Sequence, residues 1–224
     1  MPDRPPPYPP PRLPERHAAL AQYRRRAGVY DLELALFEPI RRRAIASLDI
    51  GPGDTVLDVG CGTGLSLALL RQRVGARGRV IGIEQSPEML KLARQRVAAA
   101  RWRNVKLIEA PVEEAELSGL ADAALFHFTH DILRRPAAVA NVMHHLQPGA
   151  HVVASGLKWA RPLLALTNLA VLPAALRSVT SLEGLSRPWS HLQRHLVDLH
   201  VQQRLLGGVF IASGRRDLRP QLSP

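Results

Sequence analysis

The 224-residue sequence predicts an α/β fold: a doubly wound sheet, mostly parallel, with an antiparallel C-terminal hairpin strand. Short aliphatic runs alternate with helical patterns across residues 55–155, which is typical of a parallel sheet with helices on both faces. A glycine-rich turn, residues 60–64, lies directly between the first of these runs and a helical pattern. Near the C-terminus, two strand-like runs flank Gly207 and Gly208, and so short a link joins only antiparallel strands.

A helix is expected over residues 15–48, ahead of the first strand. Leu32, Leu36 and Ile40 recur at helical spacing and form an apolar stripe. The same pattern places residues 41–43, all arginine, on a polar flank of this helix.

The expected strands share a high content of Val, Ile and Leu and stand between turn signals. They cover residues 55–59, 79–83, 105–108, 123–128 and 151–155. Helices are expected over residues 65–73, from Pro87 onward, and up to Leu146. Ser86 is a suitable cap for the second of these, because a serine hydroxyl accepts a hydrogen bond from a free helical N–H.

Beyond the alternating region, helical patterns cover residues 162–180 and 186–196, and the hairpin strands follow over 197–206 and 209–213. The chain is therefore expected to divide into five parts. These are a disordered proline-rich tail at 1–14, an N-terminal helical cover at 15–50, the α/β domain at 51–216 with an apolar helical insert at 157–190, and a disordered tail at 217–224.

Composition narrows the class of protein. The single cysteine, Cys61, excludes a disulfide framework and a cysteine-rich zinc site. The net charge is +11, but only three of the 30 basic residues are lysine and the arginines scatter along the chain. This pattern indicates codon bias more than a nucleic-acid partner. No secretory h-region and no apolar run of about 18 residues is present, so the expected location is cytoplasmic.

The glycine turn predicts a ligand site where the strands end. In an open α/β sheet, ligands bind beyond the carboxyl ends of the strands, here at residues 58–64, Glu84 and Phe128. A dinucleotide motif would need a third glycine at the position of Leu65. Asp58 would repel a pyrophosphate, whereas Glu84 could accept hydrogen bonds from a ribose diol. The residues therefore favour a ligand with a ribose, a cationic amino group and no phosphate.

Residues 56–64 (VLDVGCGTG) and 81–90 (IGIEQSPEML) resemble two consecutive motifs of the class I S-adenosylmethionine-dependent methyltransferases. The resemblance covers residues 55–155 and extends to the closing hairpin, whose last strand is antiparallel in that family. It implies a Rossmann-like sheet, S-adenosyl-L-methionine as cofactor and the activity of a methyltransferase.

The resemblance also implies roles for single residues. Asp58 would hold the amino group of the cofactor, and Glu84 would bind the ribose hydroxyls. The remaining cofactor-binding residues would lie along the methionine and adenine parts: Gly60, Gly62, Gly64, Gln85, Val112 and Phe128. One departure concerns the adenine, because Pro111 stands where many relatives carry an acid. The adenine would then be held near Val112, or Glu113 would substitute.

Candidate catalytic residues follow the fourth strand. His127, His130 and Asp131 could act as general bases if the acceptor is protonated at neutral pH. An alternative interpretation is that His130 and Asp131 cap the next helix, since Asp is a preferred cap. No metal site is predicted.

The expected function is methyl transfer to an O, N or C atom of a small, hydrophobic acceptor, mainly by proximity and alignment. The alternatives are methylation of a phospholipid or RNA, or a non-catalytic cofactor-binding partner protein. RNA is disfavoured because residues 128–131 (FTHD) lack the Asn/Asp-Pro-Pro-aromatic signature of nucleic-acid amine methylases. Peripheral membrane contact through the insert stays open as an alternative, and the sequence carries no signal for an oligomeric state.

Overall fold

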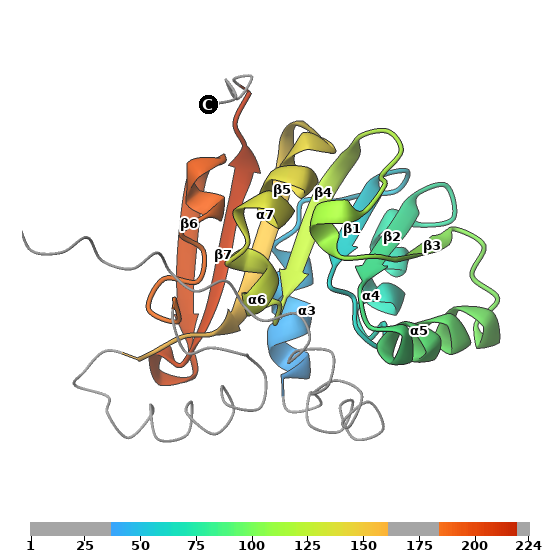
Figure 1. Cartoon of the computed structure of the whole chain (residues 1–224), viewed down its shortest axis with the longest axis horizontal. Helices are drawn as coiled ribbons and strands as arrows, with labels where there is room; N and C mark the ends of the chain where they lie inside the picture. Colours follow the sequence, from blue (N-terminus) through green and yellow to red (C-terminus); the bar gives the residue numbers. More distant parts are fainter. Residues whose placement is uncertain (1–36, 161–183, 219–224) are drawn as a thin grey trace, which may run out of the picture.

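Seven strands form one sheet in the computed structural model, which describes residues 37–160 and 184–218 (Figure 1). Their bounds are β1 (Thr55–Val59), β2 (Arg79–Glu84), β3 (Val105–Glu109), β4 (Ala121–His127), β5 (Leu146–Leu157), β6 (Leu196–Arg204) and β7 (Val209–Arg216). The strand order is β3-β2-β1-β4-β5-β7-β6.

The pairing confirms the predicted fold class. The pairs among β1 to β5 are parallel, whereas β7 runs antiparallel to both β5 and β6. The strand order reverses at β1, which has β2 on one side and β4 on the other. Such a switch point leaves a crevice at the carboxyl ends of the strands. We call this side of the sheet the carboxyl edge, where β1, β2, β4 and β5 end.

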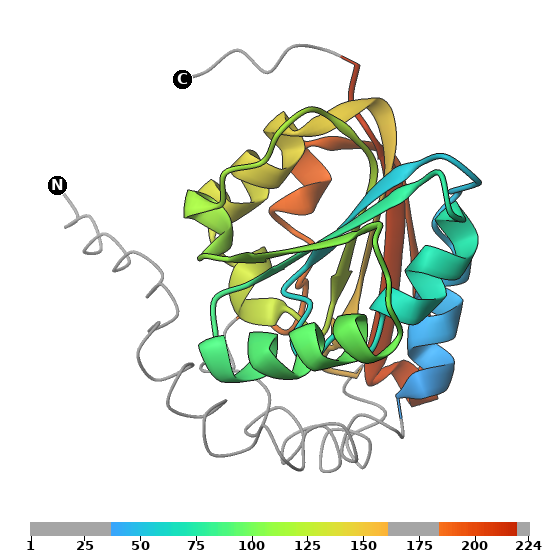
Figure 2. The same cartoon turned by 90° about the vertical axis from the view of Figure 1, so that its right-hand side faces the viewer.

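Helices cover both faces of the sheet, as Figure 2 shows for α3 and α4 on one side and α7 on the other. The helices are α3 (Glu38–Ala46), α4 (Leu67–Val74), α5 (Pro87–Ala99), α6 (His130–Leu133) and α7 (Pro136–His144). Three short 3-10 helices are η1 (Val112–Glu114), η3 (Leu192–Arg194) and η4 (Leu205–Gly207). Ser86 caps α5 as expected, since its hydroxyl accepts a hydrogen bond from the Met89 amide at 3.3 Å.

The two faces correspond to two apolar clusters, because successive strand residues point to opposite sides. Val56 of β1 and Leu125 of β4 pack on the side of α3 and α4, whereas Leu57 and Phe126 pack on the side of α7. None of the helices within 37–160 and 184–218 is long and apolar enough to span a bilayer.

Most strand bounds shift by a few residues from the sequence-based expectation, and two segments differ more. The fifth strand starts at Leu146, ahead of the expected 151–155, and a register shift opposite Ala121 and Ala123 absorbs Pro148 in its irregular start. The helix expected over 186–196 is wrong: turns occupy most of it and only η3 is helical. Pro188 interrupts this segment, and a proline inside a helix removes a hydrogen bond. The expectations for 1–36, 161–183 and 219–224 lie outside the described residues.

Gly82, in the middle of β2, provides a test of the packing. A Cβ atom here would lie 2.8 Å from Leu107 Cδ2 and 2.9 Å from Cys61 Sγ. We expect Gly82→Ala to lower the free energy of unfolding by about 1–3 kcal/mol, because an extra methyl group overpacks a dense core. Urea unfolding of the variant and the wild type measures this change in the free energy of unfolding. The control is Gly51→Ala, where nothing lies within 4 Å of the added Cβ; equal midpoints for both variants would contradict the packing described.

Candidate functional site

A group of polar side chains replaces the apolar pattern at the carboxyl edge, on the side of α3. Asp58 shares this side of β1 with Val56, and His127 shares it on β4 with Leu125. Ser155 lies on the same side of β5, between Val153 and Leu157. Strand alternation therefore brings three polar residues from distant parts of the chain to one place.

The glycine turn after β1 is tied to the end of β2. The amides of Gly60 and Cys61 both donate to the carbonyl oxygen of Ile83, at 2.9 and 3.0 Å. Gly60, Gly62 and Gly64 all have positive φ, at 71°, 55° and 84°, a region that favours glycine. Gly60 also allows a close approach, since a Cβ there would lie 2.6 Å from Thr129 Cγ2.

Glu84 joins this turn to the start of α5. Its buried carboxylate accepts hydrogen bonds from the Gly62 amide at 3.0 Å and from the Ser86 amide at 2.8 Å. Burial raises the pKa of Glu84, and these amides oppose the rise. Each carboxylate oxygen has a further lone pair, so Glu84 can accept from a ligand hydroxyl while it holds the turn.

Asp58 is buried, and one of its carboxylate oxygens has no hydrogen-bond partner among the described residues. Only 2% of the residue is exposed, and within the described part of the chain its Oδ2 has no hydrogen-bond partner. Burial raises the pKa of Asp58 to about 7, with Arg41 opposing the rise and Glu84 adding to it. An uncompensated carboxylate is unfavourable in a protein interior, so this position suits a cationic ligand group.

Arg41 of α3 belongs to the same group, and the expectation that it lies on a polar flank is wrong. The residue is 2% exposed and forms an ion pair with Glu38. The sequence held the signal for this: residue 41 shares the helical stripe of Ile45 and Leu48, four and seven positions later. Sequence reasoning missed it because arginine was taken to be exposed.

These side chains enclose a cavity of about 30 Å³ beside the glycine turn. Its walls include Arg41, Asp58, His127 and residues 60–63. A cavity of this size holds a small polar group such as a water or an ammonium ion. The open carboxylate oxygen, the positive-φ glycines and the nearby guanidinium together fit the charged amino-acid end of a ligand.

His127 faces this cavity as a neutral ring. Its Nδ1 lies 2.7 Å from Ser155 Oγ, and its Nε2 is buried with no hydrogen-bond partner among the residues described. Burial, with the Arg41 charge nearby, lowers the pKa of His127 to about 3. A ring with so low a pKa is a weak base.

His130 lies deeper, against β5 and β7. Its Nε2 lies 2.6 Å from the Leu157 carbonyl oxygen, and its ring meets Phe210 edge-on at 6.2 Å. Gly156 makes room for it, because a Cβ there would lie 2.5 Å from the ring. Burial lowers the pKa of His130 to about 4. These contacts favour a packing role over a base. Asp131 is half-buried in the first turn of α6, whose cap residue Thr129 makes no side-chain cap bond.

The other candidate residues lie around the same edge. Phe128 has a positive φ of 58°, and its ring packs 4.7 Å from that of Phe37. Gln85 is half-buried just after β2. Val112 is buried in η1, and its carbonyl oxygen accepts from Asn141 Nδ2 at 2.7 Å.

Glu113, the alternative adenine partner, is engaged elsewhere. Its carboxylate forms an ion pair with Arg135 at 2.8 Å. Glu113 and the carbonyl oxygen of Val112 are therefore both paired within the chain.

Comparison with known proteins gives a family match for the region that carries this site. Residues 56–149 match the family described as Methyltransferase domain. A malonyl-[acyl-carrier protein] O-methyltransferase from Serratia marcescens is 30% identical over 142 residues, which cover 63% of this chain and 53% of that protein. The match and this relative support the resemblance of the chain to the class I S-adenosylmethionine-dependent methyltransferases. The chain spans about half the length of the curated relatives it matches, or less.

Solved methyltransferase structures share the fold. An O-methyltransferase family protein from Burkholderia thailandensis superposes with a TM-score of 0.67 at 18% identity, covering 91% of this chain and 63% of that one. The N-methyltransferase NodS from Bradyrhizobium japonicum, in complex with S-adenosyl-L-homocysteine, gives a TM-score of 0.59 at 19% identity, covering 80% and 87%. These comparisons support S-adenosyl-L-methionine as the cofactor. The carboxyl edge of this chain offers carboxylates and a guanidinium, which are groups of a kind that suits its charged end.

Removing the Glu84 carboxylate tests the fit of the cofactor. We expect Glu84→Ala to weaken binding of S-adenosylmethionine by about 1.5–3 kcal/mol, the usual contribution of a hydrogen bond to a charged group. Glu84→Gln should lose less, because its amide oxygen can still accept. Calorimetric titration gives the affinities, with thermal melting to verify folding; unchanged affinity in a folded Glu84→Ala protein would remove this residue from the site.

The raised pKa of Asp58 predicts a pH dependence of stability. Below the ordinary pKa of 3.8, Asp58 is protonated in both the folded and the unfolded chain. The contribution of the protonated side chain to the free energy of unfolding is therefore fully present there. As the pH rises to about 7, the unfolded chain loses the proton first and the contribution disappears, by roughly 4 kcal/mol in total.

The Asp58→Asn variant has no proton to lose at this position. Between pH 4 and pH 8, its free energy of unfolding should therefore increase relative to that of the wild type. Buffered urea unfolding of both proteins measures the difference. His127 and His130 have lowered pKa values and give the opposite slope, but they are present in both proteins and cancel. Parallel pH profiles would show that Asp58 is ionised in the folded protein throughout.

Proposed function

We propose that this chain transfers a methyl group from S-adenosylmethionine to a small, hydrophobic acceptor. The observation that carries the proposal is the open Oδ2 of Asp58, buried beside Arg41 in a cavity bounded by the glycine turn. A carboxylate buried in this way destabilises the folded chain unless a cation binds next to it. The cofactor carries an ammonium group, which meets this need.

Each part of the cofactor then has residues that would hold it. Asp58 would bind the amino group and Arg41 the carboxylate of its methionine end. Glu84 would accept from the ribose hydroxyls, with Gln85 and Val112 bordering the adenine. Gly60, Gly62 and Gly64 would let the backbone approach it. When bound, the cofactor supplies an activated methyl group on a sulfonium sulfur.

The low pKa values of the two histidines favour an acceptor that does not need a general base. His127 and His130, with pKa values of about 3 and 4, stay neutral and accept a proton weakly near pH 7. We infer that the enzyme acts by holding nucleophile and methyl group in line, which can contribute about 7–11 kcal/mol. The acceptor would carry its own lone pair at neutral pH, and a carboxylate is the simplest such group.

Two further observations support this choice of acceptor. The Serratia marcescens relative is named malonyl-[acyl-carrier protein] O-methyltransferase. In this chain, we expect residues from the segments 15–50 and 157–190 to bind the acceptor; of these, the structure describes 37–50, 157–160 and 184–190. Both contain apolar residues that suit a hydrophobic carboxylic acid.

The test begins with calorimetric titration of the full chain with S-adenosylmethionine and with NAD. We expect the first to bind and the second not to bind. Labelled methyl transfer is then measured on hydrophobic carboxylic acids, with matched phenols and amines as controls. We expect label in the acids. Cofactor binding without label in any acceptor would favour a non-catalytic partner protein.

His127→Asn separates alignment from base catalysis. Without a base role for His127, turnover should fall by less than about a hundredfold, because general bases contribute roughly 10²–10⁴-fold. Asparagine retains a polar group beside Ser155. A larger loss, together with a rate that rises with pH only in the wild type, would identify His127 as the base.

A further inference from the structure

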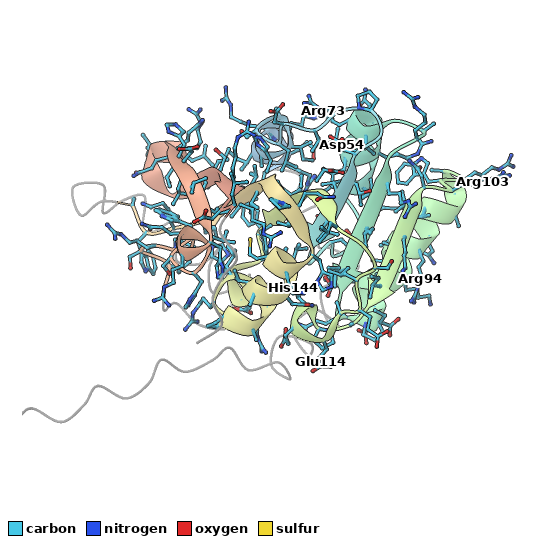
Figure 3. The ribbon with its side chains drawn as sticks, turned by 90° about the horizontal axis from the view of Figure 1, so that it is seen from above. Asp54, Arg73, Arg94, Arg103, Glu114 and His144 are labelled. Atoms are coloured by element: carbon cyan, nitrogen blue, oxygen red, sulfur yellow. The ribbon has the colours of Figure 1, made fainter. Side chains whose placement is uncertain are left out.

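An open groove lies away from the cofactor site, on the outer side of α5 and β3. It has a volume of about 460 Å³. Trp102, Val105 and Leu107 are among the apolar side chains of its floor, and Arg94, Arg101 and Arg103 form its basic rim. Figure 3 shows Arg103 projecting beyond the edge of the sheet, with Arg94 on the same side of the molecule.

The fold explains why apolar side chains are left half-exposed here. β3 is the last strand at its edge of the sheet, and a parallel sheet is normally covered on both faces. Val105 and Leu107 point toward α5 and pack on the core, yet both are only partly buried. A further element on this groove would complete the cover.

Charge is segregated along β3. Arg79, Arg101 and Arg103 are exposed near its amino end, while Glu109, Glu113 and Glu114 follow at its carboxyl end. The arginines are scattered along the sequence as expected, but the fold brings three of them, Arg94, Arg101 and Arg103, together at this edge. The exposed arginines at the amino end of β3 lie away from the cofactor site, whereas at the carboxyl end Arg94 is paired with Glu109.

The side chains that line the groove favour a protein partner over RNA. RNA-binding surfaces commonly stack bases on aromatic rings, but Trp102 is the single aromatic residue lining this groove, and Arg71 lies over its ring at 5.8 Å. Aliphatic side chains make up most of the remaining floor. Arg94 already binds the Glu109 carboxylate at 2.9 Å, so carboxylates suit this rim.

We propose that the α5–β3 groove is the docking site for an acidic amphipathic helix of a partner protein. Its apolar face would cover Val105 and Leu107, and its acidic flank would pair with Arg101 and Arg103, which is the usual arrangement of a helix in a groove. The proposal is independent of the proposed function, because the groove shares no residue with the cofactor site.

Ala98 and Ala99 provide a matched pair of variants. Both are exposed on α5, but Ala98 lines the groove and Ala99 is not among the lining residues. The probe is a fluorescein-labelled peptide of about 16 residues, long enough for a marginal helix, with leucines on one face and glutamates beside them. Fluorescence anisotropy with the full chain measures binding. Ala98→Glu should weaken it about tenfold, since like charges oppose association, while Ala99→Glu should change it less than about twofold.

Two competitors decide between the outcomes. A scrambled peptide of the same composition should bind about tenfold more weakly, because its leucines no longer share a face. A short oligouridine should not displace the helical peptide. Equal binding of the scrambled peptide, equal losses in both variants, or tighter binding of the RNA would each overturn the proposal. Cofactor titration of both variants verifies that they are folded.

Discussion

The two hydrogen bonds that Glu84 accepts, from the amides of Gly62 and Ser86, hold the functional end of the sheet together. They join the turn after β1, the end of β2 and the start of α5 through one buried carboxylate. A buried carboxylate is stable only when its oxygens are paired. The glycine turn therefore depends on Glu84 for its position, and Glu84 depends on the turn for its partners. The same residue can then present its remaining lone pairs to a ribose.

The neighbouring carboxylate, Asp58, differs from Glu84 in its hydrogen bonding. Asp58 is as buried as Glu84, yet one of its oxygens has no hydrogen-bond partner in the described residues. Burial raises the pKa of Asp58 to about 7, with Arg41 opposing the rise. The fold thus carries one carboxylate that is paired with two amides and one with an unpaired oxygen beside Arg41, a position that suits a ligand cation. Such separation of two acids by environment is a common basis for binding sites.

The electrostatics of the two ends of β3 divide the surface into separate regions. The acidic residues after β3 lie toward the cofactor side, and the exposed arginines before it lie at the α5–β3 groove. An acidic partner at the groove would not compete with the cofactor for charge. A net charge of +11 is thus less informative than where the charges lie.

The sequence by itself determined the alternation of strands and helices along residues 55–155 and the glycine turn. It also determined that Asp58 and Glu84 are acids at strand ends. These follow from local periodicity and turn chemistry, which act over neighbouring residues. Only the tertiary structure decided that Arg41 lies beside Asp58 and His127, and that His130 packs under Phe210. These residues are far apart along the chain, and periodicity indicates the face a side chain takes but not its neighbours from other elements. The shared burial that shifts their pKa values arises from that meeting alone.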